Sequence, residues 1–407
     1  MQALPRAEWT ARAAAHERRV DAWVQRHLER RRRGEKHPVH DFLFTYYSQR
    51  PAALRRWLPG FGTVLLDAPE YSSLKAYARI VHDVSPASVG VSSAERRGLS
   101  VAGEYLTSQR RLVEGVRRLL ATTASRPPTL GCFGLHEWAM VHAGDSSEDR
   151  RRHDWPLRLG QQGTDAVVES HRITCSHFDA FRFFTESARP LNTLSPGRDD
   201  REAFEQPGCL HAGMDLYKHA FRLSPLVPSE LVADCFALAR DIRELDMRAS
   251  PYDFSALGYE PVRIETIEGK QEYVAAQRAS AQRGAPLRQR LVDECDRLLE
   301  AMDDVAGNRM RVPGERRTVG AMADQDVVDR FVQGGRLVIM PTKRSKRLLV
   351  LDHVAQSFEP GRTYPEAEVN AVLRGFHDDY AALRRYLVDE MFLTREGGIY
   401  WRSGGTV

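Results

Sequence analysis

Residues 171–253 hold the chain's densest mixture of reactive polar side chains and apolar sequence. The stretch contains the segments HRITCSHFDAFRFF, QPGCLHAGMDLYKHAFRL and ELVADCFALARDIRELDMRASPYD. Its first two segments repeat one pattern, a Cys followed two positions later by a His and then by an Asp: Cys175, His177 and Asp179, then Cys209, His211 and Asp215. Polar groups buried in apolar surroundings cost free energy unless they are paired or used. The fold must therefore satisfy this cluster or employ it.

The periodicity of apolar residues predicts a mainly α-helical protein. Ser229 is suited to cap a helix whose buried face repeats at helical spacing, through Leu231, Cys235, Leu238, Ile242 and Leu245. Amphipathic patterns predict further helices over residues 7–33 and 273–301. The capping-box pair Ser92 and Glu95 predicts the start of another long helix, with Leu99, Ala102, Leu106, Val113, Val116 and Leu120 on one face.

Asp246 lies near the predicted end of the helix that Ser229 begins. A carboxylate at the C-terminal end of a helix opposes the helix dipole. We therefore expect Asp246 and the nearby Asp253 to have arginine partners, with Arg243 and Arg248 nearest, or a functional task.

The length of 407 residues exceeds the usual size of one compact core, so two domains are expected. We predict a helical catalytic or binding domain over residues 1–302 and a linker over 303–339. The remaining residues, 340–407, predict a small winged-helix-like α+β domain, because three helical patterns precede a hairpin whose turn contains Gly397 and Gly398. Its third helix carries Arg384 and Arg385, which we expect to face outward for contact with nucleic acid.

Composition indicates an ordinary globular protein, with 42% hydrophobic and 28% charged residues. No apolar run approaches the roughly 18 residues that a membrane helix needs, and the N-terminus does not resemble a signal peptide. We expect a cytoplasmic protein without a membrane partner. The five cysteines form no CxxC pair, so we expect reduced thiols rather than a disulfide framework.

The Cys and His pairs allow a metal site as one hypothesis. Cys132 with His136 adds a third pair to the two in the central stretch, so His136, His177 and His211 are the candidate ligands. Imidazole and carboxylate donors suit zinc or iron. A zincin motif after His136 is excluded, because Met140 stands where its second His would be.

A site that needs no metal or other cofactor is the other hypothesis. One carboxylate can stabilise the cationic transition state of N-glycosidic cleavage, and the candidates are Asp215, Asp179 and Glu137, with His177 and His211 as further catalytic residues. An extruded base requires aromatic stacking and cations for its phosphates. The candidates for those contacts are Tyr46, Tyr47, Arg50, Arg55, Arg56, Trp57 and Trp138.

Two segments resemble known families. The sequences HDFLFTYYSQRPAALRRW, RITCSHFDAFRFF and CLHAGMDLYKHAFRLSPLVPSELVADCFALARDIRELDMRASPYD resemble proteins of high-GC bacteria labelled 3-methyladenine DNA glycosylase, over roughly residues 37–300. Residues 340–402 resemble a small domain of unknown function that often follows ArsR-type DNA-binding domains. These resemblances imply a nucleobase-processing enzyme that binds DNA.

Three functional hypotheses follow. The first is a DNA glycosylase that excises damaged or modified bases from DNA or another nucleobase-containing substrate. The second is a metal-dependent oxygenase or hydrolase that acts on a small molecule through the His and Asp cluster. The third is a non-enzymatic ligand-binding regulator. In each case the C-terminal domain is a candidate for docking a protein partner or a second copy of the chain.

Overall fold

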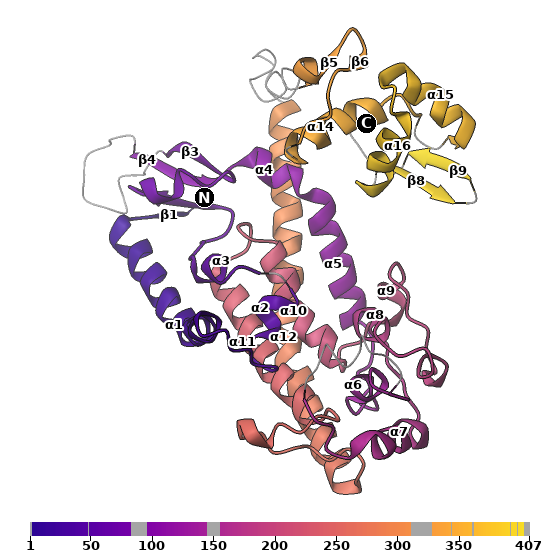
Figure 1. The fold of residues 1–407 in the computed structure, drawn as a ribbon. Helices are drawn as coiled ribbons and strands as arrows, with labels where there is room; N and C mark the ends of the chain where they lie inside the picture. Colours follow the sequence, from indigo (N-terminus) through magenta and orange to yellow (C-terminus); the bar gives the residue numbers. More distant parts are fainter. Residues whose placement is uncertain are drawn as a thin grey trace. The chain divides into compact units, whose positions relative to one another are not determined.

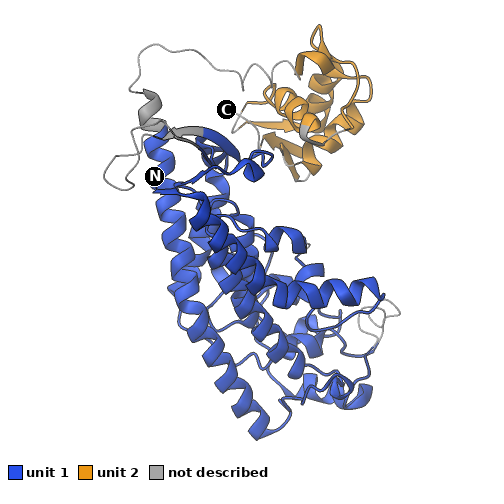
Figure 2. Ribbon diagram, turned by 90° about the vertical axis from the view of Figure 1, so that its left-hand side faces the viewer, with its two compact units in different colours: residues 1–311 blue, residues 312–407 orange. Residues whose placement is uncertain are grey.

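The computed structural model describes residues 2–47, 49–82, 96–144, 155–310, 328–342, 344–359, 362–390, 392–396 and 398–402. The chain divides into two compact units, residues 1–311 and 312–407 (Figure 2). Residues 303–310, which the sequence assigns to a linker, instead continue the last helix of the first unit. No helix among the described residues is long and apolar enough to cross a membrane.

The first unit is built around four helices that pack against one another (Figure 1). They are α5 (Arg110–Ala124), α10 (Leu210–Arg222), α11 (Ser229–Arg248) and α12 (Ile267–Met310). The predicted apolar face of α11 is buried, since Leu231, Cys235 and Ile242 are each at most 1% exposed. The expectation of a mainly helical protein is confirmed.

Gly213 allows α10 and α11 to approach closely. A Cβ atom at this position would lie only 2.7 Å from Cδ1 of Ile242 on α11. The Ile242 side chain would therefore have to move to admit a residue with a side chain at position 213. The close packing places the start of α10, which carries His211, beside the end of α11, which carries Asp246.

The first unit also contains a small sheet, which the sequence pattern does not predict. Its strands are β1 (Gln2–Leu4), β2 (Thr63–Leu66), β3 (Tyr77–His82) and β4 (Arg96–Val101), in the order β1-β2-β4-β3. The helix predicted to include Leu99 is therefore wrong at its start, because Leu99 lies in β4 opposite Leu65 of β2 and Arg79 of β3. Ser92 and Glu95 fall outside the described residues. Helix α4 (Gly103–Ser108) and α5 follow and bury the rest of the predicted face.

Shorter helices carry several of the candidate residues. They are α2 (Phe42–Thr45), α3 (Pro51–Arg55), α6 (Leu135–Ala139), α7 (Gly160–Ser170), α8 (Phe178–Phe181) and α9 (Arg201–Phe204). Helix α6 packs against α7 and α8, whereas α9 packs against α5 (Figure 1). The long N-terminal helix α1 (Arg6–Arg32) matches the predicted charged helix and buries Trp9, Val20 and Val24.

The second unit has the predicted α+β composition. Its elements are β5 (Val332–Gln333), β6 (Arg336–Leu337), α14 (Arg344–Ala355), β7 (Thr363–Pro365), α15 (Glu366–Phe376), α16 (Tyr380–Asp389), β8 (Leu393–Glu396) and β9 (Ile399–Arg402). An antiparallel sheet of order β7-β9-β8 accompanies the three helices, as in a winged helix. The Asp379 carboxylate accepts a hydrogen bond from the Ala382 N–H at 3.0 Å and caps α16.

Candidate functional site

Three helices bring two histidines and one aspartate together inside the first unit. His136 comes from α6, His211 from α10 and Asp246 from α11, and these side chains are 2%, 8% and 0% exposed. One donor atom from each lies within 4.8 Å of the others. His136 Nε2 is 3.0 Å from Asp246 Oδ1, yet neither atom makes a well-aligned hydrogen bond to a described residue. Because these donor atoms could hold a metal ion, we call the three residues the metal-ligand triad.

Backbone geometry at α6 positions His136. Gly134, which precedes the helix, has φ +68°, a conformation that favours glycine. The indole of Trp138 then donates a hydrogen bond of 2.8 Å to the Ala249 carbonyl, just beyond the end of α11. This bond holds α6 against α11 and thereby His136 against Asp246. Trp138 is fully buried, and its ring packs under the Arg158 guanidinium.

Arg243 connects the triad to a second carboxylate. Its Nη1 atom donates to Asp246 Oδ2 at 2.7 Å and to Glu137 Oε1 at 2.9 Å. Burial alone would raise the pKa of Asp246, but the charges of His136 and Arg243 hold it below its usual range. Asp246 is therefore a carboxylate at neutral pH. The other oxygen of Glu137, Oε2, has no hydrogen-bond partner among the described residues.

The two triad histidines have opposite pKa shifts. Burial lowers the pKa of His136, but the Asp246 charge outweighs it and the net pKa is well above the usual value. His211 has a pKa well below its usual value, because of burial and then repulsion from His136. The rings meet edge to face with centroids 4.5 Å apart. His211 is thus a neutral imidazole at pH 7, the form that binds metal ions, whereas His136 is an imidazolium paired with Asp246 and has to release its proton before it can bind an ion.

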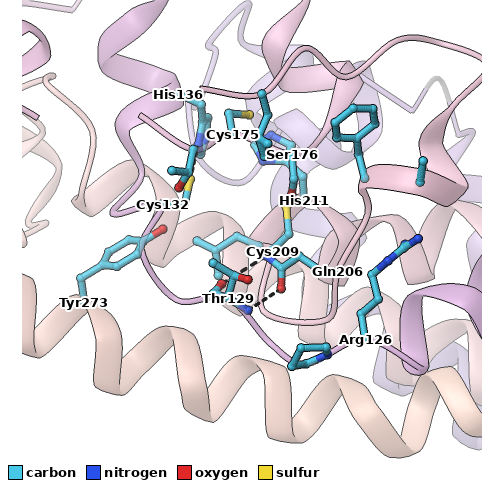
Figure 3. Close-up of a pocket in the computed structure, with 16 residues that line it drawn as sticks. Arg126, Thr129, Cys132, His136, Cys175, Ser176, Gln206, Cys209, His211 and Tyr273 are labelled. Atoms are coloured by element: carbon cyan, nitrogen blue, oxygen red, sulfur yellow. Dashed lines mark hydrogen bonds between the residues drawn. The ribbon is translucent and has the colours of Figure 1, made fainter. Parts of the chain in front are cut away.

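Cys175, the Cys209 and His211 pair, and the Cys132 and His136 pair line one cavity, which we call the cysteine cavity (Figure 3). It has a volume of about 340 Å³ and is lined by His136, His211, Cys132, Cys175 and Cys209, among others. Cys132 Sγ lies 3.8 Å from His136 Nδ1. Burial raises the pKa of the Cys175 and Cys209 thiols, so both are protonated at neutral pH. All five cysteines are free, as the sequence predicts.

A second cavity, which we call the aromatic cavity, also reaches His211. Its volume is about 310 Å³, and its lining combines rings and charged groups: Phe42, Tyr46, Phe183, Tyr252, Glu137, Asp179, Arg243 and His211. His211 therefore lines both cavities. A cavity of this size with aromatic walls and a few polar groups is typical of small-molecule sites.

Asp215 belongs to a separate set of ion pairs, which we call the Asp215 cluster. Its Oδ1 accepts a hydrogen bond from the Tyr47 hydroxyl at 2.9 Å, and its Oδ2 accepts from Arg201 at 2.7 Å and from Lys218 at 3.1 Å. Burial would raise its pKa, but hydrogen bonding and nearby positive charge hold that pKa well below the usual range. Every oxygen of Asp215 is thus occupied.

His177 and Asp179 adjoin this cluster. His177 Nε2 lies 3.5 Å from Asp215 Oδ2 and 3.5 Å from Glu205 Oε1. Lys218 bridges Asp215 to Asp179 Oδ2 at 2.9 Å. The sequence groups His177 with the two triad histidines. The structure places it with the carboxylates of the Asp215 cluster, although its ring is 5.3 Å from that of His211.

The aromatic and basic residues predicted between positions 42 and 57 do not form one surface. Tyr46 lines the aromatic cavity, whereas the Trp57 indole is buried and donates to Glu230 at 2.9 Å. Arg55 pairs with Asp21 at 2.6 Å, and Arg56 is exposed. Arg50 lines a third cleft, described below.

Comparison with known proteins finds one family. Residues 336–402 match the model of a family described as an uncharacterized protein conserved in bacteria, DUF2087. No curated protein and no solved structure matches the chain. The match lies in the second unit and agrees with the expected small domain of unknown function. The resemblance of residues 37–300 to glycosylase-labelled proteins finds no such match, so function must be argued from the chemistry of the site.

Within the unit that matches this family, the two predicted nucleic-acid contacts differ. The Arg384 guanidinium donates to Glu366 at 2.6 Å and to Asn370 at 2.5 Å, and its side chain is only 17% exposed. It does not face outward as expected, because α15 supplies these partners. Arg385 is exposed and is the one of the two whose side chain is open to a ligand.

Proposed function

We propose that the first unit is a metal-dependent hydrolase in which His136, His211 and Asp246 bind zinc. The observation that carries this proposal is the convergence of three buried donor atoms, two of which lack a well-aligned hydrogen bond to any described residue. Ligand atoms bound at about 2.1 Å to one ion lie roughly 3.0–3.4 Å apart, and His136 and Asp246 are 3.0 Å apart. Two histidines and a carboxylate leave a coordination position for water.

The surroundings of the triad suit hydrolysis. Zinc held by these three residues would supply an activated water for hydrolysis, because zinc lowers the pKa of a water bound to it. Glu137 Oε2 has no partner in the described part of the chain and lines the aromatic cavity, so it can accept the proton of that water. Arg243 fixes Asp246 and Glu137 relative to each other, the kind of outer contact that orients metal ligands.

The aromatic cavity supports a substrate with a planar ring. Phe42, Tyr46 and Tyr252 supply aromatic walls, and such walls favour stacking on a flat ring. His211 lies at the same cavity, so a ring held there sits beside the proposed metal. A heteroaromatic compound the size of a nucleobase fits this combination.

Elemental mass spectrometry of the purified protein tests the metal site. We expect close to one zinc ion per chain, lost in His211→Ala and in Asp246→Asn. His171→Ala is the matched control, because His171 is a partly buried histidine that belongs to no part of the triad. Absence of any transition metal, together with no zinc binding in a titration, would refute the proposal. Stoichiometric iron in place of zinc would favour an oxygenase.

A metal-free base-excising glycosidase is the second candidate. It is favoured by the position of Asp179, which lines the aromatic cavity and is an anion, since the Lys218 charge outweighs burial and lowers its pKa. A carboxylate beside a stacked ring can stabilise the cation formed as an N-glycosidic bond breaks. Release of free base from alkylated duplex DNA by chelator-treated protein, abolished in Asp179→Asn, would establish this candidate over the hydrolase.

A further inference from the structure

A third hollow, which we call the basic cleft, adjoins the aromatic cavity. Its volume is about 760 Å³, large enough for a nucleotide-sized ligand. The cations along it are Arg31, Lys36, Arg50 and Arg243, and the carboxylates along it are Glu35 and Asp41. The balance between these charges determines what the cleft can bind.

Both carboxylates already have partners: the arginines lie outside the lining, and His27 lines the cleft beside Asp41. Glu35 accepts two hydrogen bonds of 2.8 Å from Arg33. Asp41 is bonded by Arg30 and, at 2.9 Å, by His27. Neither acid is therefore free to compensate the cations that line the cleft.

Three of the cations have no such partner. Arg31, Lys36 and Arg50 form no ion pair and no side-chain hydrogen bond with the residues that the structure describes, and all three are exposed. Arg243 is different, since Glu137 and Asp246 already pair with it. The cleft thus presents three uncompensated positive charges around one hollow, an arrangement that favours an anion with more than one charge.

Phe42 and Arg243 join the cleft to the proposed active site. Both residues line the basic cleft and the aromatic cavity, and the Arg243 guanidinium lies 3.9 Å from the Phe42 ring centroid. Arg243 also bonds Asp246 of the triad at 2.7 Å. A ligand in the cleft is therefore separated from the metal-ligand triad by the Arg243 side chain alone.

We propose that the basic cleft binds the phosphate of the substrate and that the aromatic cavity takes its ring, so that the substrate class is a nucleotide-like phosphate ester. Phosphate carries up to two charges and accepts the paired N–H groups of arginine, which suits Arg31 and Arg50. The assignment of this ligand as substrate rests on the proposed function. Its binding does not, because none of the three cations belongs to the triad.

Calorimetric titration of the full-length protein tests the proposal, with adenosine 5′-monophosphate, adenosine and pyrophosphate as probes. We expect the monophosphate to bind at least about tenfold more tightly than adenosine, and pyrophosphate to compete with it. The triple variant Arg31→Ala/Lys36→Ala/Arg50→Ala should lose this preference and bind adenosine and its monophosphate equally.

The matched control is Arg18→Ala/Arg26→Ala/Arg111→Ala, which removes the same charge from exposed arginines that do not line the cleft. It should bind the monophosphate like the unaltered protein. Circular dichroism of each variant checks that the fold is intact. An equal loss in the control would show unspecific attraction by net charge and would overturn the proposal.

The remaining outcomes are equally decisive. Equal affinity for adenosine and its monophosphate, or no binding of any probe at millimolar concentration, would overturn the phosphate site. Tight binding of a six-nucleotide single strand without binding of mononucleotides would replace it with a nucleic-acid groove. Monophosphate binding that persists in His211→Ala, in a protein without metal, would leave the phosphate site standing even though the hydrolase proposal fails.

Discussion

Helix α10 contributes to two polar clusters, through His211 and, one turn later, Asp215. The clusters differ in how their charged groups are hydrogen-bonded. In the Asp215 cluster, Tyr47, Arg201 and Lys218 occupy both carboxylate oxygens. In the metal-ligand triad, His136 Nε2 and Asp246 Oδ1 lie close together without a well-aligned hydrogen bond to any described residue. His211 faces two cavities. His136 Nε2 and Asp246 Oδ1 form a buried ion pair with each other at 3.0 Å, so the triad differs from the Asp215 cluster in its open cavities and not in unpaired charge. The first cluster has the features of a structural element and the second those of a functional site.

The strongest test of this contrast is Asp215→Asn. The substitution leaves the partly buried Arg201 and Lys218 without one of their counter-charges, although Glu205 and Asp179 remain. Breaking such a pair typically costs about 3 kcal/mol or more of unfolding free energy. We expect that loss in urea unfolding, with zinc content unchanged. Asp241→Asn, at an exposed pair with Arg283, should cost less than about 1 kcal/mol. A loss of zinc in Asp215→Asn would remove the distinction between the clusters.

Metal binding should affect stability next most strongly. An ion that binds only the folded state at a hundred times its dissociation constant stabilises by about 2.7 kcal/mol. Scanning calorimetry with added zinc should show this gain in the unaltered protein, and a chelator should remove it. His211→Ala should show neither effect. If zinc stabilises that variant to the same extent, the ion binds elsewhere.

His219 is a buried histidine outside the triad whose ring makes no hydrogen bond to a described residue, so it lies between the two clusters in character. Both of its ring nitrogens lack partners among the described residues, and burial, partly opposed by Asp215, lowers its pKa from 6.5 to about 3. Between pH 6.5 and pH 3, His219 is therefore protonated in the unfolded chain and neutral in the folded protein. Stability is complete above pH 6.5 and falls as the pH drops toward 3, by about 2 kcal/mol at pH 5.

The measurement is the urea midpoint of His219→Leu between pH 7 and pH 5. This variant cannot titrate at position 219, so its stability should fall by about 2 kcal/mol less than that of the unaltered protein. His171→Leu, at a partly exposed histidine, should keep the original pH dependence. If the stability of His219→Leu depends on pH as that of the unaltered protein does, the folded protein binds a proton at His219 as readily as the unfolded chain.

The two histidines of the triad can be predicted from the sequence, but its aspartate cannot. His136 and His211 are candidate ligands from the sequence, because Cys209 precedes His211 by two positions and Cys132 precedes His136 by four. Asp246 stands out in the sequence only as a carboxylate at the unfavourable end of a helix, and its place in the triad depends on the packing of α10 against α11. The partners of Asp215 were hidden for a similar reason, since Arg201 reaches it from α9, beyond a loop.

The error at β4 has a different origin. Leu99, Leu106, Val113 and Leu120 are spaced by seven residues, which fits a helix, yet Leu99 and Val101 also alternate as in a strand. Local pattern does not separate these cases. Residues 96–101 form a strand because they pair with β3, which lies beside them in the fold. Such a long-range contact cannot be read from the segment itself.

The same contrast between occupied and open groups recurs in the second unit, with the smallest expected effect. Arg384 is held by Glu366 and Asn370, whereas Arg385, its neighbour on α16, is exposed. Arg384→Ala should lower the unfolding free energy of this unit by about 1 kcal/mol, and Arg385→Ala should change it by less than about 0.5 kcal/mol. If the unit binds DNA, filter binding should be weakened by Arg385→Ala at low salt. The reverse order of stabilities would show that the Arg384 contacts contribute no net free energy, and burial would then not distinguish structural from functional arginines here.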